Sequence, residues 1–243
     1  MAVVTGGSRG IGAETARALA ASGAVVAVVS RDLATLAGVA DDIRERGGRA
    51  LAVPADCTIE DDLRRAAVTV VEQLGPADVL ATFAGGRGLP VATAEETAEH
   101  WRLVIESDLT ATFLTISAFL PAMLERRTGS IVTMSSAAGR QPARSNAAYA
   151  AAKGGVIALT RHLAAELAPQ GIRLNCVAPS AIENERMRAA MTGEQRRQLG
   201  ESFPLRRIGQ PADVASAVLF LASRASSWIT GITLDVAGGK IMV

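Results

Sequence analysis

Tyr149, Lys153 and Ser136 have the residue types and the spacing for proton-transfer chemistry. Residues four apart on a helix share a face, so the ammonium of Lys153 would lie beside the phenol of Tyr149. A nearby positive charge favours the phenolate, which makes the hydroxyl an effective proton donor or acceptor near neutral pH. Ser136 lies upstream and adds a hydroxyl that can hold a substrate oxygen. These three residues predict an acid–base centre, and the surrounding elements must bring them together.

The composition is that of a globular chain without a strongly charged surface. The chain has 243 residues, of which 49% are hydrophobic, and a net charge of +1. This length suits one domain with a full core. The near-neutral charge gives no reason to expect a nucleic acid or an anionic membrane as a partner. The cysteines, Cys57 and Cys176, predict buried thiols rather than a disulfide framework or a metal site.

The N-terminus favours a cytoplasmic protein. No apolar run approaches the roughly 18 residues that a membrane-spanning helix needs. Residues 2–4 have the pattern of a strand, and a glycine-rich turn begins at Thr5, which leaves no room for a targeting peptide. We therefore expect a cytoplasmic location and no membrane partner.

Short β-branched segments alternate with longer segments rich in Ala, Leu, Arg and Glu, a pattern typical of parallel strands joined by crossover helices. Seven strands are expected, near residues 2–5, 24–30, 49–54, 77–83, 129–135, 172–178 and 231–236. No linker interrupts this α/β alternation, so residues 1–243 are predicted to form one doubly wound domain. Residues 183–204 break the rhythm and predict an inserted helix, which would be a lid over the carboxyl ends of the strands.

A glycine-rich loop follows the first strand and opens the first helix. Its sequence is Thr5-Gly6-Gly7-Ser8-Arg9-Gly10-Ile11-Gly12. Glycines permit positive φ angles and let the backbone approach a pyrophosphate, which the free N–H groups of a helix N-terminus stabilise. A dinucleotide cofactor is therefore predicted to bind Gly6, Ser8, Arg9, Gly10, Ile11 and Gly12.

The end of the second strand bears on the choice of cofactor. NAD-binding folds usually place a carboxylate there, where it accepts hydrogen bonds from the adenosine ribose. Ser30 takes that place, and Arg31 and Arg9 can instead hold a 2′-phosphate through charge-assisted hydrogen bonds. NADP(H) is therefore the preferred cofactor, while Asp32, directly after Arg31, keeps NAD(H) possible.

Motifs along essentially the whole chain resemble those of the short-chain dehydrogenase/reductase family. They are the Thr5 to Gly12 loop, Asp56-Cys57-Thr58, Ala84-Gly85, Ser136, Tyr149 with Lys153, Val177-Ala178-Pro179, and the closing stretch from Thr230-Gly231 through Gly238-Gly239. The resemblance implies a Rossmann-type fold with a seven-stranded parallel sheet. It also implies that Asp56 and Cys57 lie near the adenine, that Ala84 and Gly85 line the cofactor, and that Pro179, Ser180 and Ile182 border the nicotinamide.

The resemblance further implies a reaction, the interconversion of a small-molecule ketone and a secondary alcohol by hydride transfer. Tyr149 would be the general acid or base at the substrate oxygen, and Ser136 would hydrogen-bond that oxygen. Lys153 would hold the nicotinamide ribose and favour the phenolate. The family also implies a homotetramer or homodimer, with Trp101 and Phe113 on the contact helices.

Asp108 is the largest departure from the family pattern. An asparagine usually stands at this place and helps to hold a water in a proton relay that reaches the lysine. An aspartate can still accept hydrogen bonds from water, but it cannot donate as an amide does. Its charge near Lys153 can instead tie the lysine into an ion pair. Asp108 is thus the fourth candidate catalytic residue, and it keeps open a second hypothesis, a cofactor-binding protein with little turnover.

Loops at the mouth of the site bear on the substrate. Gly86, Arg87 and Gly88 follow the fourth strand, and Arg140 and Arg144 follow the fifth. Arginines in these loops favour a polar or anionic substrate. The alternative is that they are solvated surface groups, and the sequence leaves both readings open.

Overall fold

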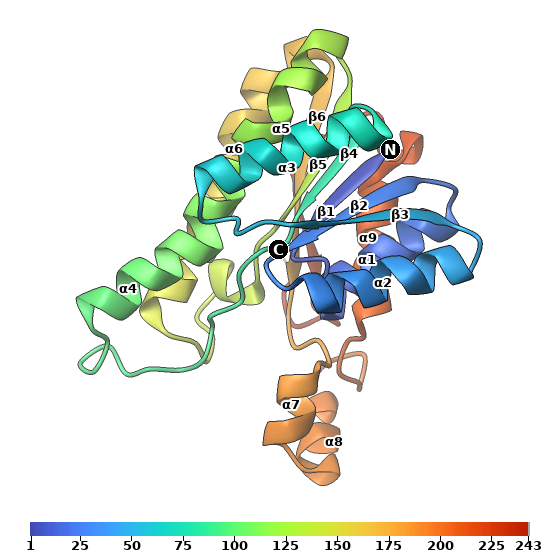
Figure 1. Cartoon of the computed structure of the whole chain (residues 1–243). Helices are drawn as coiled ribbons and strands as arrows, with labels where there is room; N and C mark the ends of the chain where they lie inside the picture. Colours follow the sequence, from blue (N-terminus) through green and yellow to red (C-terminus); the bar gives the residue numbers. More distant parts are fainter. Residues whose placement is uncertain (243) are drawn as a thin grey trace.

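Seven short strands form one parallel sheet, as the sequence predicts, with helices on both faces (Figure 1). The structure is a computed structural model and describes residues 1–242. The strands are β1 (Ala2–Thr5), β2 (Val25–Ser30), β3 (Arg49–Pro54), β4 (Val79–Thr82), β5 (Gly129–Met134), β6 (Ile172–Pro179) and β7 (Thr233–Val236). Their order across the sheet is β3-β2-β1-β4-β5-β6-β7. The predicted doubly wound α/β fold is therefore confirmed.

Two hydrophobic cores lie on opposite faces of the sheet. The helices over one face are α1 (Gly10–Ala21), α2 (Leu33–Glu45) and α9 (Pro211–Ala222), and those over the other are α3 (Glu60–Leu74), α5 (Ala111–Arg126) and α6 (Ala147–Leu167). Val4 and Val132 pack with the first set, whereas Val3 and Ile131 pack with the second. Successive strand residues point to opposite faces, so burial on both sides requires strands that are apolar throughout.

The strand order places a crevice at the carboxyl ends of β1 and β4. The chain runs from β1 outward to β3 and then returns to β4 on the other side of β1. Loops that leave two such neighbouring strands turn to opposite faces of the sheet, and the space between them is where open α/β sheets bind ligands. The glycine loop after β1 and the segment that begins at Phe83 after β4 therefore enclose the predicted cofactor site.

A continuous helix leads from the predicted substrate loop back into the core. It consists of α4 (Ala98–Ile105), the wider π-helical turn η1 (Glu106–Thr110) and α5. By length and composition these 29 residues are apolar enough to cross a membrane. The sequence analysis expected no apolar stretch of that length. In the structure, Ile116 and Met123 of this helix pack in the core against the sheet.

The predicted lid is wrong in one respect, because residues 183–204 contain two short helices rather than one. They are α7 (Glu185–Ala190) and α8 (Gly193–Glu201), and Figure 1 shows them projecting from the rest of the molecule. The side chain of Thr192 starts a new helix by accepting a hydrogen bond from the backbone N–H of Gln195, whose side chain bonds back to Thr192 N–H. This capping box begins α8 directly after α7 has ended.

Candidate active site

A cleft of about 760 Å³ occupies the crevice and is lined by most of the predicted cofactor residues together with Tyr149 and Ser136. The predicted cofactor residues in its lining are Gly6, Ser8, Arg9, Gly10, Ile11, Gly12, Ser30, Arg31, Asp56, Cys57, Ala84, Gly85, Tyr149, Pro179, Ser180 and Ile182. Ser136 lines the same cleft. Lys153 and Asp108 lie behind the lining, with 4% and 0% of their surface exposed.

The glycine loop is built for close backbone approach. A Cβ on Gly6 would lie 2.5 Å from the carbonyl oxygen of Phe83, and one on Gly12 would lie 2.2 Å from that of Gly6. Gly10 has a φ of 55°, which disfavours other residues, and no atom would contact its added Cβ. The helix α1 starts there without a side-chain cap, so its first N–H groups are free to bind an anion. The loop therefore fits a dinucleotide pyrophosphate.

The adenosine end of the cleft carries an exposed cation. Arg31 is 69% exposed at its side chain, and its guanidinium lies 3.8 Å from the carboxylate of Asp56. Partial burial raises the pKa of Asp56, but hydrogen bonds from Thr58 and the charges of Arg31 and Arg87 outweigh it and lower that pKa below its ordinary value. Asp32 caps α2 by accepting from the backbone of Ala34 and Thr35 and does not line the cleft.

The helix α6 positions the acid–base residues. Its side chains at 149 and 153 share a face, and the Lys153 ammonium nitrogen (Nζ) lies 5.5 Å from the centroid of the Tyr149 ring. Ser136 caps the short turn after β5, where its hydroxyl oxygen accepts from the backbone N–H of Ala138 at 3.2 Å. The hydroxyl proton of Ser136 remains available to donate to a ligand in the cleft.

Asp108 contacts Lys153 directly, which is the ion pair that the sequence offered as the alternative to a water-holding carboxylate. The Lys153 Nζ lies 3.2 Å from Asp108 Oδ1 and donates to the carbonyl oxygen of Met134 at the same distance. Asp108 also accepts from the backbone N–H groups of Gly86 (2.6 Å) and Arg87 (3.3 Å) and from the hydroxyl of Ser107 (2.8 Å). The carboxylate is therefore fully engaged with protein donors.

Tyr149 and the Asp108 carboxylate favour the charged form of Lys153. Burial by itself lowers the pKa of Lys153, but its attraction to Tyr149 and Asp108 and the hydrogen bond to Asp108 raise the net pKa above the ordinary value. A buried ammonium without such a partner would tend to lose its proton. The ion pair thus favours a cation beside the Tyr149 ring.

The loop arginines differ in their freedom to meet a substrate. Arg140 forms a bidentate ion pair with Asp235, at 2.9–3.2 Å, and is therefore occupied. Arg87 and Arg186 line the cleft, and neither forms an ion pair with any carboxylate of residues 1–242. Arg144 is exposed and outside the cleft lining. Only part of the predicted arginine set faces the site.

Asn146 escapes a reading of the sequence alone, whereas Gly88 was expected only as part of the loop at the mouth of the site. Asn146 is completely buried and caps α6 by accepting from Tyr149 N–H at 2.7 Å. Gly88 packs so closely on Tyr149 that an added Cβ would lie 2.9 Å from the ring carbons Cδ1 and Cε1. In the sequence, an asparagine three residues before Tyr149 can be identified only as a helix N-cap. Its hydrogen bonds to Arg87 and Leu89 are visible only in the structure.

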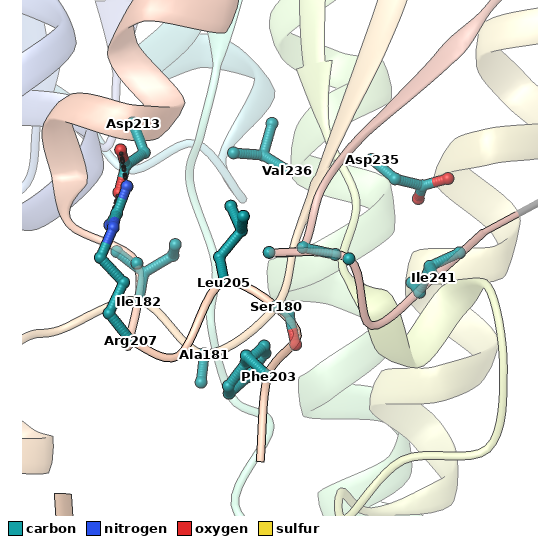
Figure 2. Close-up of a pocket in the computed structure, with 14 residues that line it drawn as sticks. Ser180, Ala181, Ile182, Phe203, Leu205, Arg207, Asp213, Asp235, Val236 and Ile241 are labelled. Atoms are coloured by element: carbon teal, nitrogen blue, oxygen red, sulfur yellow. Dashed lines mark hydrogen bonds and ion pairs between the residues drawn. The ribbon is translucent and has the colours of Figure 1, made fainter. Parts of the chain in front are cut away.

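A second cavity of about 390 Å³ lies between the base of the lid and the C-terminal segment (Figure 2). Figure 2 shows Arg207 and Asp213 facing each other on one side, while Asp235 lies on the other. This cavity shares Ser180 and Ile182 with the cleft but includes none of the acid–base residues. The larger cleft is therefore the candidate site.

Comparison with known proteins agrees with this geometry. A family model described as enoyl-(acyl carrier protein) reductase matches residues 6–240. The 3-oxoacyl-[acyl-carrier-protein] reductase of Staphylococcus epidermidis is 38% identical over 246 residues, covering 99% of this chain and 98% of that protein.

Solved structures are also similar over the full length. An actinorhodin polyketide ketoreductase with NADPH has a TM-score of 0.93 at 36% identity, covering 98% of this chain and 95% of that one. A 3-oxoacyl-[acyl-carrier protein] reductase from Brucella melitensis with bound NAD has a TM-score of 0.89 at 36% identity, covering 100% of this chain and 91% of that one.

Proposed function

Because the chain belongs to the short-chain dehydrogenase/reductase family of oxidoreductases, we propose that it is an NADP(H)-dependent ketoreductase acting on 3-oxoacyl thioesters. The observation that carries this proposal is the presence of Tyr149 and Ser136 in the same cleft as the glycine loop, with the Lys153 cation behind the tyrosine ring. The thioester substrate is argued from the name of the Staphylococcus relative, because the cleft itself requires only a ketone or a secondary alcohol.

When bound, the nicotinamide supplies or accepts the hydride. In the reducing direction the Tyr149 hydroxyl donates its proton to the substrate carbonyl oxygen, and the tyrosinate accepts it back in the oxidising direction. The Ser136 hydroxyl donates a hydrogen bond to the same oxygen and fixes its position. Lys153, held by Asp108 and the Met134 carbonyl, stabilises the negative charge that develops on Tyr149.

NADP(H) is preferred over NAD(H) for reasons of charge. Arg31 and Arg9 line the cleft and can bind a 2′-phosphate. Asp32, the carboxylate that would favour a ribose hydroxyl, is already engaged as the cap of α2. The relative with bound NAD keeps NAD(H) as the alternative cofactor.

The assembly and location follow the family expectation. Trp101 and Phe113 are 41% and 49% exposed on the helix that begins with α4, and such large apolar side chains gain free energy when a partner covers them. We infer a cytoplasmic homotetramer or homodimer, which the mass of the protein in solution would test.

One observation supports a second candidate, a cofactor-binding protein with little turnover. Lys153 directs hydrogen bonds to Asp108 and to Met134, which leaves one of its three ammonium protons for a cofactor ribose. The cofactor can therefore still bind, while the Asp108 carboxylate offsets the Lys153 charge that would stabilise a Tyr149 phenolate and so slows proton transfer.

The decisive experiment follows NADPH oxidation with 3-oxoacyl thioesters, simple ketones and enoyl thioesters as substrates, with Tyr149→Phe as the matched control. We expect 3-oxo compounds to be reduced and the variant to lose at least about 100-fold in kcat. Turnover of enoyl thioesters alone would assign a C=C reductase instead. Absence of Tyr149-dependent turnover with every substrate would favour the binding protein.

A further inference from the structure

The segment after β4 reaches Tyr149, and its residues Gly85, Gly86 and Arg87 line the cleft. Residues 85–89 leave β4 and run past Tyr149, where Gly88 leaves no room for a methyl group beside the ring. A substrate carbonyl that reaches Tyr149 through the cleft therefore lies beside this loop. The position of the loop sets the space for the groups on either side of that carbonyl.

Asn146 ties this loop to the helix of Tyr149. Its side-chain Nδ2 donates to the carbonyl oxygens of Arg87 (2.8 Å) and Leu89 (2.9 Å), which flank Gly88. Its Oδ1 accepts from the backbone N–H of Tyr149. One buried amide therefore uses both donor protons on the loop and its acceptor on the catalytic residue.

Asp108 holds the same loop through its backbone N–H groups. It accepts from Gly86 N–H and Arg87 N–H, so the N–H of Arg87 bonds to one buried side chain and its carbonyl to another. Asp108 and Asn146 therefore both hold residues 86–89 in place beside Tyr149 and Lys153.

We propose that Asn146 is a positioning residue, which sets the distance between the Tyr149 hydroxyl and residues 85–89 and thereby the shape of the substrate site. This inference rests on the proposed function for its effect on catalysis. The tether, by which we mean the hydrogen bonds of Asn146 to Arg87, Leu89 and Tyr149, does not depend on the proposed function. An amide is required, because serine and aspartate can cap a helix but cannot donate to two carbonyl oxygens.

Asn146→Asp separates the two roles of the residue. Aspartate keeps the N-cap acceptor and caps as well as asparagine does, but its carboxylate faces the carbonyls of Arg87 and Leu89 and repels them. We expect a folded protein whose NADPH affinity stays within about 2-fold and whose kcat/KM falls about 10- to 100-fold, mainly through kcat.

Thr97→Ala is the matched control, because Thr97 caps the neighbouring helix α4 through His100 N–H and has no bond to residues 85–89. It removes a cap without touching the tether, and its kcat/KM should stay within about 2-fold of the parent protein. Gly88→Ala provides an independent test by wedging a methyl group against Tyr149, and it should lower kcat while leaving NADPH affinity unchanged.

Limited proteolysis tests the tether without any assay of turnover. Arg87 is exposed and is a trypsin site, but both of its backbone groups are bonded, so cleavage requires the loop to open. Trypsin should cut after Arg87 at least about 10-fold faster in Asn146→Asp than in Thr97→Ala or the parent protein, with the cut mapped by mass spectrometry.

The possible outcomes test the tether and the proposed enzymatic function separately. An unchanged cleavage rate after Arg87 in Asn146→Asp would overturn the tether. Faster cleavage with unchanged kcat/KM would overturn the positioning role. Faster cleavage in a protein without Tyr149-dependent turnover would leave the tether standing and remove the proposed function. If Asn146→Asp fails to fold, a normal kcat in Gly88→Ala would overturn the claim that the loop shapes the site.

Discussion

One ion pair lies behind the lining near Tyr149 and another lies in the lining at the predicted adenosine end of the cleft, and the two pairs differ in burial. At the catalytic end, Lys153 and Asp108 are 3.2 Å apart, with side chains only 5% and 0% exposed. At the adenosine end, Arg31 and Asp56 are 3.8 Å apart, with side chains 69% and 27% exposed. The first pair is inaccessible and tightly held, whereas the second is loose and open to solvent.

This difference separates structural charge from charge that is available to a ligand. A buried charge that loses its partner faces a low-dielectric interior, so breaking the pair is costly. An exposed pair contributes little to stability because water and salt screen it. Arg31 can therefore exchange Asp56 for a phosphate, while Lys153 stays fixed beneath Tyr149.

The largest effect is expected from Asp108→Ala. It leaves the Lys153 ammonium without its carboxylate and leaves Gly86 N–H and Arg87 N–H without an acceptor. We expect a loss of about 3–5 kcal/mol in the free energy of unfolding, or about 6–20 °C in Tm. Arg31→Ala is the control at the exposed pair and should change stability by less than about 1 kcal/mol. Equal losses of unfolding free energy in the two variants would show that the buried and the exposed ion pair do not differ in their contribution to stability.

Asp108→Asn tests the charge of the buried pair with little change in shape. Without the carboxylate, burial is less fully offset and the pKa of Lys153 falls from its raised value. The alkaline limb of the rate–pH profile for ketone reduction should therefore move to lower pH. A profile identical to that of the parent protein would show that Asp108 does not control the lysine.

The same pair makes stability depend on alkaline pH. A lysine whose folded pKa is raised contributes stability that is complete below its unfolded value of 10.5 and is lost as pH rises through the folded value. Denaturant unfolding should show the parent protein losing more stability than Asp108→Asn from about pH 10.5 upward. Parallel curves for the two proteins would contradict this linkage.

Arg31→Ala should affect ligand binding rather than folding. Removing one charge-assisted contact to a 2′-phosphate should weaken NADPH binding about 10-fold and leave NADH binding within about 2-fold. Fluorescence titration with both cofactors measures this ratio. Equal losses for NADPH and NADH would mean that Arg31 does not recognise the 2′-phosphate.

The smallest effect concerns Cys57. This residue lines the cleft near the exposed Arg31, yet its own side chain is buried. Its thiol is 6% exposed, and burial raises its pKa to about 11. At pH 8 a thiol reagent should modify the folded protein far more slowly than the unfolded one, because little thiolate is present. Rapid labelling of Cys57, mapped by mass spectrometry, would show that the cleft opens more widely there.

Local sequence was sufficient for much of the fold and for a candidate site most of whose residues line one cleft. The apolar strands and the glycine loop after β1 predicted the parallel sheet and the crevice, because both patterns follow from backbone rules within a few residues. The lid was predicted as one helix because a capping box that starts a second one, at Thr192, is easily missed in a polar segment.

The sequence by itself determined that Tyr149 and Lys153 share a helix face and that a cofactor loop precedes them, since both depend on spacing along the chain. Only the tertiary structure decided what Asp108 and Asn146 do. Their partners Lys153, Gly86 and Leu89 lie dozens of residues away and meet them only when β4, η1 and α6 pack together. A side chain's donors and acceptors are set by such long-range packing, and no local pattern specifies them.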